Sequence, residues 1–138
     1  MTVGRIMALD HGSDRVGVAV SDPLGITAQP HSTLDASSAR LMDDIRNLAT
    51  DLGVELVVVG LPVSLDGTEG PSAAAARHFA AEVGVATGLE VEMVDERFTS
   101  NIAERAMIEA GTRRRDRREA RDRVAAAVFL QSYLDGRT

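Results

Sequence analysis

Acidic residues that follow apolar segments are the side chains of this chain that could bind divalent metal ions. Asp10 directly follows one apolar run, and Asp95 and Glu96 follow another. A fourth acid, Asp122, lies in the C-terminal segment. Mg²⁺ prefers oxygen ligands, and two such ions ~4 Å apart can activate water and stabilise the leaving oxygen of a phosphodiester. These residue types therefore indicate metal-dependent phosphodiester chemistry, although an acid after a strand is also a common turn residue.

Positive charge is concentrated in one segment of an otherwise acidic chain. All fifteen basic residues are arginine, and seven of them lie within residues 113–123. That segment has a local charge of about +4, which leaves about −10 on the rest of a chain whose net charge is −6. Such a segment can bind a phosphate backbone without reading its sequence, or it can be a solvated loop and helix start. We expect nucleic-acid contacts from Arg113, Arg114, Arg115, Arg117 and Arg118.

The composition excludes several classes of protein. The chain has 138 residues, which suits a single domain over 1–138. Because it has no cysteine, disulfides and thiolate metal sites are ruled out, and a reducing cytoplasm is the expected location. Asp10 interrupts the N-terminal apolar run before a signal-peptide core could develop, and no apolar run approaches the ~20 residues that span a bilayer. We therefore expect no membrane contact.

The hydrophobic pattern predicts strands and helices that alternate after an opening hairpin. Residues 3–9 and 15–21 are apolar or alternating runs joined by a short polar turn, which is typical of two antiparallel strands. Asp35, Ser37 and Ser38 are good helix-starting residues. The further expected elements are a strand over 25–34, a helix up to Leu52 that Gly53 ends, a strand over 54–59, a helix over 71–86, a strand over 91–94, a helix over 99–110 and a last helix over about 119–134.

This order predicts an α/β fold with a mixed five-stranded sheet flanked by helices. Right-handed crossovers place the strand that begins at Val54 beside the first strand, and the strand that begins at Val91 beyond it. These three strands then run parallel, and their C-terminal ends share the edge where open α/β sheets usually bind ligands. Asp10 and Glu96 would lie at that edge, and Asp122 could complete the site from the last helix.

Four sequence segments together resemble the motifs of the YqgF/RuvX family. They are Asp10–Asp22 (DHGSDRVGVAVSD), residues 59–71 with VGLP and DGTEGP, Asp95–Ser100 (DERFTS) and Asp122–Ala126 (DRVAA). The resemblance covers nearly the whole chain. It implies a ribonuclease-H-like fold similar to that of the RuvC resolvase. Members of the family are described as Holliday-junction resolvases and as nucleases that mature the 5′ end of pre-16S ribosomal RNA.

Carried over to this chain, the resemblance implies that Asp10, Glu96 and Asp122 are the catalytic metal ligands. They would bind Mg²⁺, with Mn²⁺ able to substitute. Asp95 would lie beside the ligands or join them. Glu69 is an alternative acid, which we expect instead in a loop whose glycines let backbone amides approach a phosphate.

Two other residues of the hairpin also have expected roles. Arg15 would support the carboxylates or contact a phosphate of the nucleic acid, although a plain ion pair within the hairpin is equally possible. Gly17 would permit close packing, since glycine is otherwise disfavoured inside a strand. His11 is assigned no role.

The expected function is an endonuclease that acts on structured nucleic acid, with precursor ribosomal RNA favoured over branched DNA. Holliday-junction resolution is the alternative within the same chemistry, and it would require a homodimer that presents two sites. A nucleic-acid-binding module without catalysis is a second alternative. The first hairpin also resembles the phosphate-binding hairpin of actin-like ATPases, but those proteins close two such domains around ATP.

Overall fold

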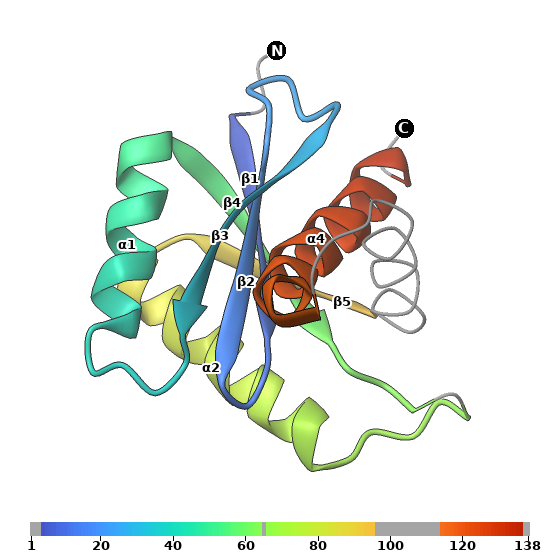
Figure 1. The fold of residues 1–138 in the computed structure, drawn as a ribbon. Coiled ribbons are helices and arrows are strands. Elements are labelled where there is room, and N and C mark those ends of the chain that lie inside the picture. The colour runs from blue at the N-terminus through green and yellow to red at the C-terminus, as the bar shows by residue number, and fades with distance from the viewer. Residues whose placement is uncertain (1–3, 65, 96–113, 137–138) are drawn as a thin grey trace.

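A mixed five-stranded sheet lies between two layers of helix (Figure 1). The structure, a computed structural model, describes residues 4–64, 66–95 and 114–136. The strand order is β3-β2-β1-β4-β5. Helices α1 and α2 cover one face of the sheet and α4 covers the other. In chain order the elements are β1 (Arg5–His11), β2 (Arg15–Ser21), β3 (Ala28–Asp35), α1 (Leu41–Leu52), β4 (Val54–Leu61), α2 (Pro71–Thr87), β5 (Glu90–Asp95) and α4 (Arg114–Asp135).

The strand directions confirm the topology predicted from the sequence. The β1, β2 and β3 strands pair antiparallel, and β1, β4 and β5 pair parallel. The C-terminal ends of β1, β4 and β5 therefore lie along one edge of the sheet, and β5 ends there at Asp95. The mixed α/β fold class is confirmed.

Two hydrophobic cores form because successive strand residues point to opposite faces of the sheet. Met7 and Leu9 of β1 pack with α1 and α2 in one core. Ile6 and Ala8 of the same strand pack with α4 in the other. The second core includes alanines on both the strands and the helix, among them Ala8, Ala19 and Ala126. Small side chains let α4 lie close to the sheet.

The turn before β3 begins with Asp22 and delays the strand. The Asp22 carboxylate accepts hydrogen bonds from the backbone amides of Leu24, Ile26 and Thr27. These amides are therefore used in the turn, so β3 starts at Ala28 rather than at residue 25 as the sequence pattern predicted. The same hydrogen bonds stabilise the charged carboxylate and lower the pKa of Asp22.

The helices also differ from the sequence prediction at their starts. Asp35 accepts hydrogen bonds from the amide and hydroxyl of Ser37, so these residues form a turn, and α1 begins only at Leu41. The α4 helix begins at Arg114 rather than near residue 119, so four of the clustered arginines belong to its first turns. The helix expected over 99–110 lies outside the described residues. Pro71 opens α2 as predicted, and Gly53 ends α1 in the left-handed conformation.

No helix within the described ranges is long and apolar enough to cross a membrane.

Candidate active site

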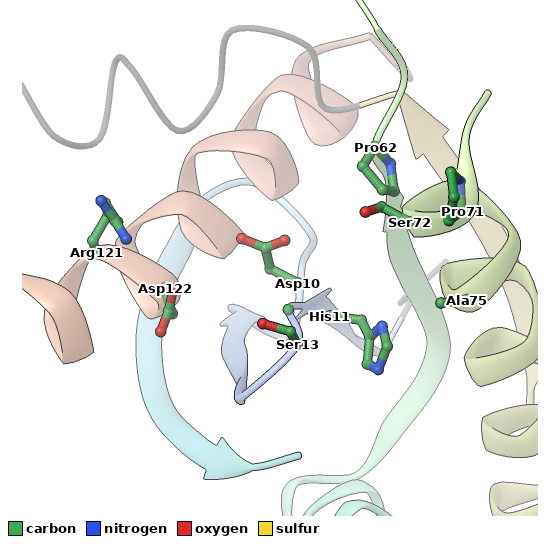
Figure 2. A pocket seen from close by; sticks show the side chains of 10 residues that line it. Asp10, His11, Ser13, Pro62, Pro71, Ser72, Ala75, Arg121 and Asp122 are labelled. Atoms are coloured by element: carbon green, nitrogen blue, oxygen red, sulfur yellow. The ribbon is translucent and has the colours of Figure 1, made fainter. Parts of the chain in front are cut away.

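Asp10 and Asp122 line one pocket of about 430 Å³ at the C-terminal edge of the parallel strands (Figure 2). Asp10 continues the alternation of Ile6 and Ala8 along β1 and therefore lies on the face of the sheet that α4 covers. Its carboxylate points toward this helix side of the pocket in Figure 2. The remaining lining comes from the β1–β2 turn, the end of β4, the start of α2, and α4: His11, Gly12, Ser13, Pro62, Pro71, Ser72, Ala75 and Arg121.

Asp122 reaches the pocket because of its position on α4. It precedes Ala126 by four residues and Phe129 by seven, which places all three on one side of the helix. Ala126 and Phe129 are buried against the sheet. Asp122 therefore extends the buried side of α4 beyond the core, toward the edge where Asp10 lies.

Gly17 allows α4 to approach the sheet at this point. It pairs with Asp10 across β1 and β2. A Cβ atom built on Gly17 would lie 2.0 Å from the backbone oxygen of Asp122, which is far inside van der Waals contact. The expectation that Gly17 permits close packing is confirmed, and the structure identifies its neighbour as the backbone that carries Asp122.

An ion pair links β2 to α4 beside the pocket. The Nε of Arg15 donates a hydrogen bond to Oδ2 of Asp122 at a distance of 2.5 Å. The two side chains are 33% and 22% exposed, so the pair is partly shielded from water. This contact matches one of the expectations for Arg15, namely that it supports a carboxylate of the predicted site. Phosphate contact by Arg15 stays a prediction.

His11 lies on the opposite face of β1, against α2. Its ring stacks on Phe79 with 4.4 Å between the ring centroids and 18° between the planes. Burial lowers the pKa of His11, and the nearby charge of Glu82 partly opposes this shift. His11 also lines a second hollow of about 350 Å³ between α1 and α2. No role was predicted for His11 from the sequence, and the structure shows its ring packed on Phe79 of α2.

Glu69, the alternative acid, is held by α2 instead. Both of its carboxylate oxygens accept hydrogen bonds from the guanidinium of Arg77, at 2.9 Å each. These bonds lower the pKa of Glu69. Asp66 accepts hydrogen bonds from the amide and hydroxyl of Thr68 within the same loop. Glu69 does not line the Asp10 pocket, and its ion pair fixes the loop to the first turns of α2.

The structure describes the other predicted site residues only in part. Asp95 is the exposed last residue of β5 and pairs with Leu61 of β4, so it lies on the expected edge but does not line the pocket. Glu96 follows it and lies outside the described residues, as does Arg113. Arg114, Arg115, Arg117 and Arg118 are placed by the backbone of α4 only.

The donor set of the pocket fits a hard divalent cation. The carboxylates of Asp10 and Asp122 and the hydroxyls of Ser13 and Ser72 are oxygen donors, which Mg²⁺ prefers. Within the described ranges no group of three or more histidine, cysteine or acidic residues is gathered closely enough to hold a metal. The described part of the chain therefore supplies two of the three expected carboxylates.

The sequence matches a family model and relatives from other bacteria over nearly its whole length. The model of the RuvX family, described as Holliday junction resolvase, matches residues 4–136. A Listeria innocua protein named "Putative pre-16S rRNA nuclease" is 46% identical over 134 residues, covering 95% of this chain and 97% of that protein. A protein of the same name from Syntrophomonas wolfei is 42% identical over 133 residues, covering 96% and 94%.

Solved structures establish the ribonuclease-H-like fold. The RuvC protein of Thermus thermophilus in complex with a Holliday junction substrate aligns with a TM-score of 0.60 and 16% identity, covering 98% of this chain and 96% of that one. Another structure of Thermus thermophilus RuvC aligns with a TM-score of 0.56 and 15% identity, covering 96% and 95%. At these identities the likeness concerns the fold alone.

Proposed function

This chain belongs to the RuvX family, and from that premise we propose that it is a divalent-metal-dependent endonuclease that acts on structured nucleic acid. One observation supports the proposal most directly. Asp10 of β1 and Asp122 of α4 are 112 residues apart in the sequence, yet both line a single polar pocket at the edge of the sheet. Carboxylates gathered in one pocket are what metal-dependent phosphodiester cleavage needs.

Asp10, Asp122 and Glu96 would hold the metal ions. A bound pair of ions would supply activated water and stabilisation of the leaving oxygen. The chain itself contributes the geometry, because β1 fixes the backbone of Asp10 and the close contact at Gly17 fixes that of Asp122. The pocket is open to solvent beside the hydroxyls of Ser13 and Ser72, which leaves room for a phosphate group.

We propose the 5′ end of pre-16S ribosomal RNA as the substrate. Relatives that are 42–46% identical over nearly the full chain are named as pre-16S rRNA nucleases, which supports the RNA as substrate. The clustered arginines in the first turns of α4 precede Asp122 on the same helix, so α4 would carry both a backbone-binding segment and a catalytic acid.

The test is cleavage of a labelled pre-16S 5′ leader in Mg²⁺ or Mn²⁺ by the wild type and by Asp10→Asn. The substitution keeps the shape of the side chain but removes its charge, so we expect cleavage to fall by about 10³-fold, equivalent to several kcal/mol of metal-dependent stabilisation. Asp14→Asn is the matched control, since Asp14 is an exposed acid of the same hairpin that does not line the pocket. Wild-type cleavage by Asp10→Asn would refute the metal site.

Holliday-junction resolution is the second candidate, and the description of the family model favours it. Resolution requires two symmetric cuts and hence a two-fold dimer. We expect the wild type to leave a four-way DNA junction uncut while cleaving the leader. Paired symmetric nicks, together with a dimer in sedimentation, would instead establish the resolvase. Binding of both substrates without metal-dependent cleavage of either would indicate a non-catalytic binding module.

A further inference from the structure

In the ion pair between Arg15 and Asp122, the guanidinium contacts a carboxylate that would also be a metal ligand. We propose that Arg15 competes with the metal for Asp122 and transfers to a substrate phosphate, so that nucleic-acid binding promotes metal binding. This inference rests on the proposed metal-dependent function. It assigns to Arg15 the role of a positioning residue that couples two binding events.

The contact is strong enough to compete. The guanidinium Nε donates directly to Oδ2 of Asp122 at 2.5 Å, which is a charge-assisted hydrogen bond. Both side chains are at most one-third exposed, so water screens their attraction less than it does for an ion pair on the open surface. A metal ion that binds through Oδ2 of Asp122 would therefore have to replace an existing cation.

The exchange of partners at Asp122 requires only side chains to move, because the backbones of Arg15 and Asp122 are both held in place. A hydrogen bond of 2.8 Å from the amide of Gly12 to the carbonyl of Arg15 closes the β1–β2 turn and holds the backbone of Arg15. The backbone of Asp122 is held against Gly17. Figure 2 shows the carboxylates of Asp10 and Asp122 pointing in different directions. Rotation of the Asp122 side chain after release by Arg15 would let it turn toward Asp10.

A phosphate is the partner that suits the released arginine. The planar guanidinium binds phosphate oxygens with paired hydrogen bonds, as it does carboxylates. Arg15 begins β2 directly beside the pocket edge and its side chain is 33% exposed, so it can reach a nucleic-acid strand that lies over the pocket. By thermodynamic linkage, nucleic acid that draws Arg15 away must tighten metal binding by the same factor as metal tightens nucleic-acid binding.

The first experiment measures Mn²⁺ binding to the full chain without nucleic acid, by electron paramagnetic resonance of the free ion. We expect Arg15→Gln to bind Mn²⁺ about tenfold more tightly than the wild type, within the usual range of coupling between sites. Asp10→Asn should bind it more weakly. Arg123→Gln is the matched control, because Arg123 is on α4 next to Asp122 but donates to Thr33. The Arg123→Gln substitution removes the same charge as Arg15→Gln and should leave the Kd for Mn²⁺ close to the wild-type value.

The outcomes separate this inference from the proposed function. If Asp10→Asn binds Mn²⁺ as well as the wild type, the metal site itself is wrong. If Asp10→Asn weakens binding but Arg15→Gln does not tighten it, the metal site stands and the competition is refuted. Equal tightening by Arg15→Gln and Arg123→Gln would show an effect of overall charge and would also refute the competition.

The second experiment measures coupling directly. Binding of the leader RNA is followed by fluorescence anisotropy with and without Ca²⁺, an oxygen-binding cation. We expect Ca²⁺ to tighten RNA binding by a factor about tenfold larger in the wild type than in Arg15→Gln. An equal factor in both proteins would overturn the transfer of Arg15 to phosphate. If Arg15→Gln does not fold, Arg15→Lys replaces it in both experiments, with the same direction of change expected and a smaller factor.

Discussion

At the scale of single residues, the alternation of β1 separates two neighbouring side chains with different chemistry. Asp10 faces α4, whereas His11 faces α2 and stacks on Phe79, although both residues line the pocket. Burial lowers the pKa of His11, so the folded protein resists its protonation. An unfolded chain then binds more protons than the folded one below the ordinary pKa of 6.5. The stability that His11 contributes is therefore complete above that pH and is lost as the pH falls through it.

We expect His11→Gln to reduce this pH dependence. The free energy of unfolding in urea is measured at pH 7.5 and at pH 5.5 with EDTA present, so that metal binding plays no part. The wild type should lose more stability between the two values than His11→Gln does. His31→Gln is the control, since His31 is exposed and its ring hydrogen-bonds to the hydroxyl of the adjacent Ser32. An identical loss in His11→Gln and the wild type would contradict the prediction.

Sequence reasoning predicted that Asp10 and Asp122 share a site and that Arg15 supports the carboxylates or contacts a phosphate, but not which carboxylate Arg15 contacts. Asp10 could be placed because it follows an apolar run in the sequence, at an edge of the sheet that the strand order defines. The contact of Arg15 with Asp122 spans 107 residues, and no local spacing indicates it. The placement of Asp122 depends on the packing of α4, which sequence spacing alone does not determine. The role of Glu96 stays a prediction, because it lies outside the described residues.

At the scale of elements, the site depends on how closely α4 packs on β2. Gly17→Ala would place a Cβ atom 2.0 Å from the backbone oxygen of Asp122, so the helix would have to move outward. Overpacking of this kind costs about 1–3 kcal/mol, and we expect a loss of that size in urea unfolding, together with weaker Mn²⁺ binding. Gly84→Ala is the control. Its Cβ would meet Val91 at 3.7 Å, an ordinary contact, and alanine favours the α2 helix.

If Gly17→Ala were as stable as Gly84→Ala, the close approach of α4 would not constrain the site.

The order of the elements was predictable, but several of their ends were not. Strand order follows from handed crossovers and short connections, which act on any sequence with this pattern. The start of β3 depends on which backbone amides Asp22 binds, and the start of α1 depends on the turn that Asp35 forms with Ser37. Side chains that hydrogen-bond to nearby backbone amides in this way determine where a strand or helix begins. The same limitation applies to α4, whose charged first turns lack the apolar periodicity that marked its later part.

At the scale of the whole molecule, charge is divided between an acidic body and the basic start of α4. Residues 113–123 carry about +4 and the remainder about −10. A polyanion approaching at random is repelled by most of the surface, so productive encounters would be those that meet the arginine segment. The segment would also direct a nucleic-acid strand toward the pocket, because Asp122 lies further along the same helix.

Replacement of Arg113, Arg114 and Arg115 by alanine tests this division. Each phosphate contact releases counterions, so losing three should flatten the plot of log binding constant against log salt by about 2 for single-stranded RNA. The control replaces Arg5, Arg40 and Arg46, which removes the same charge at sites away from α4: Arg5 donates to the Ser21 carbonyl, Arg40 precedes α1 and Arg46 pairs with Asp43. If net charge alone governed binding, both triple variants would change the slope equally. A change confined to the Arg113, Arg114 and Arg115 variant would show that the segment contacts the nucleic-acid backbone, and an unchanged slope in that variant would indicate a solvated segment.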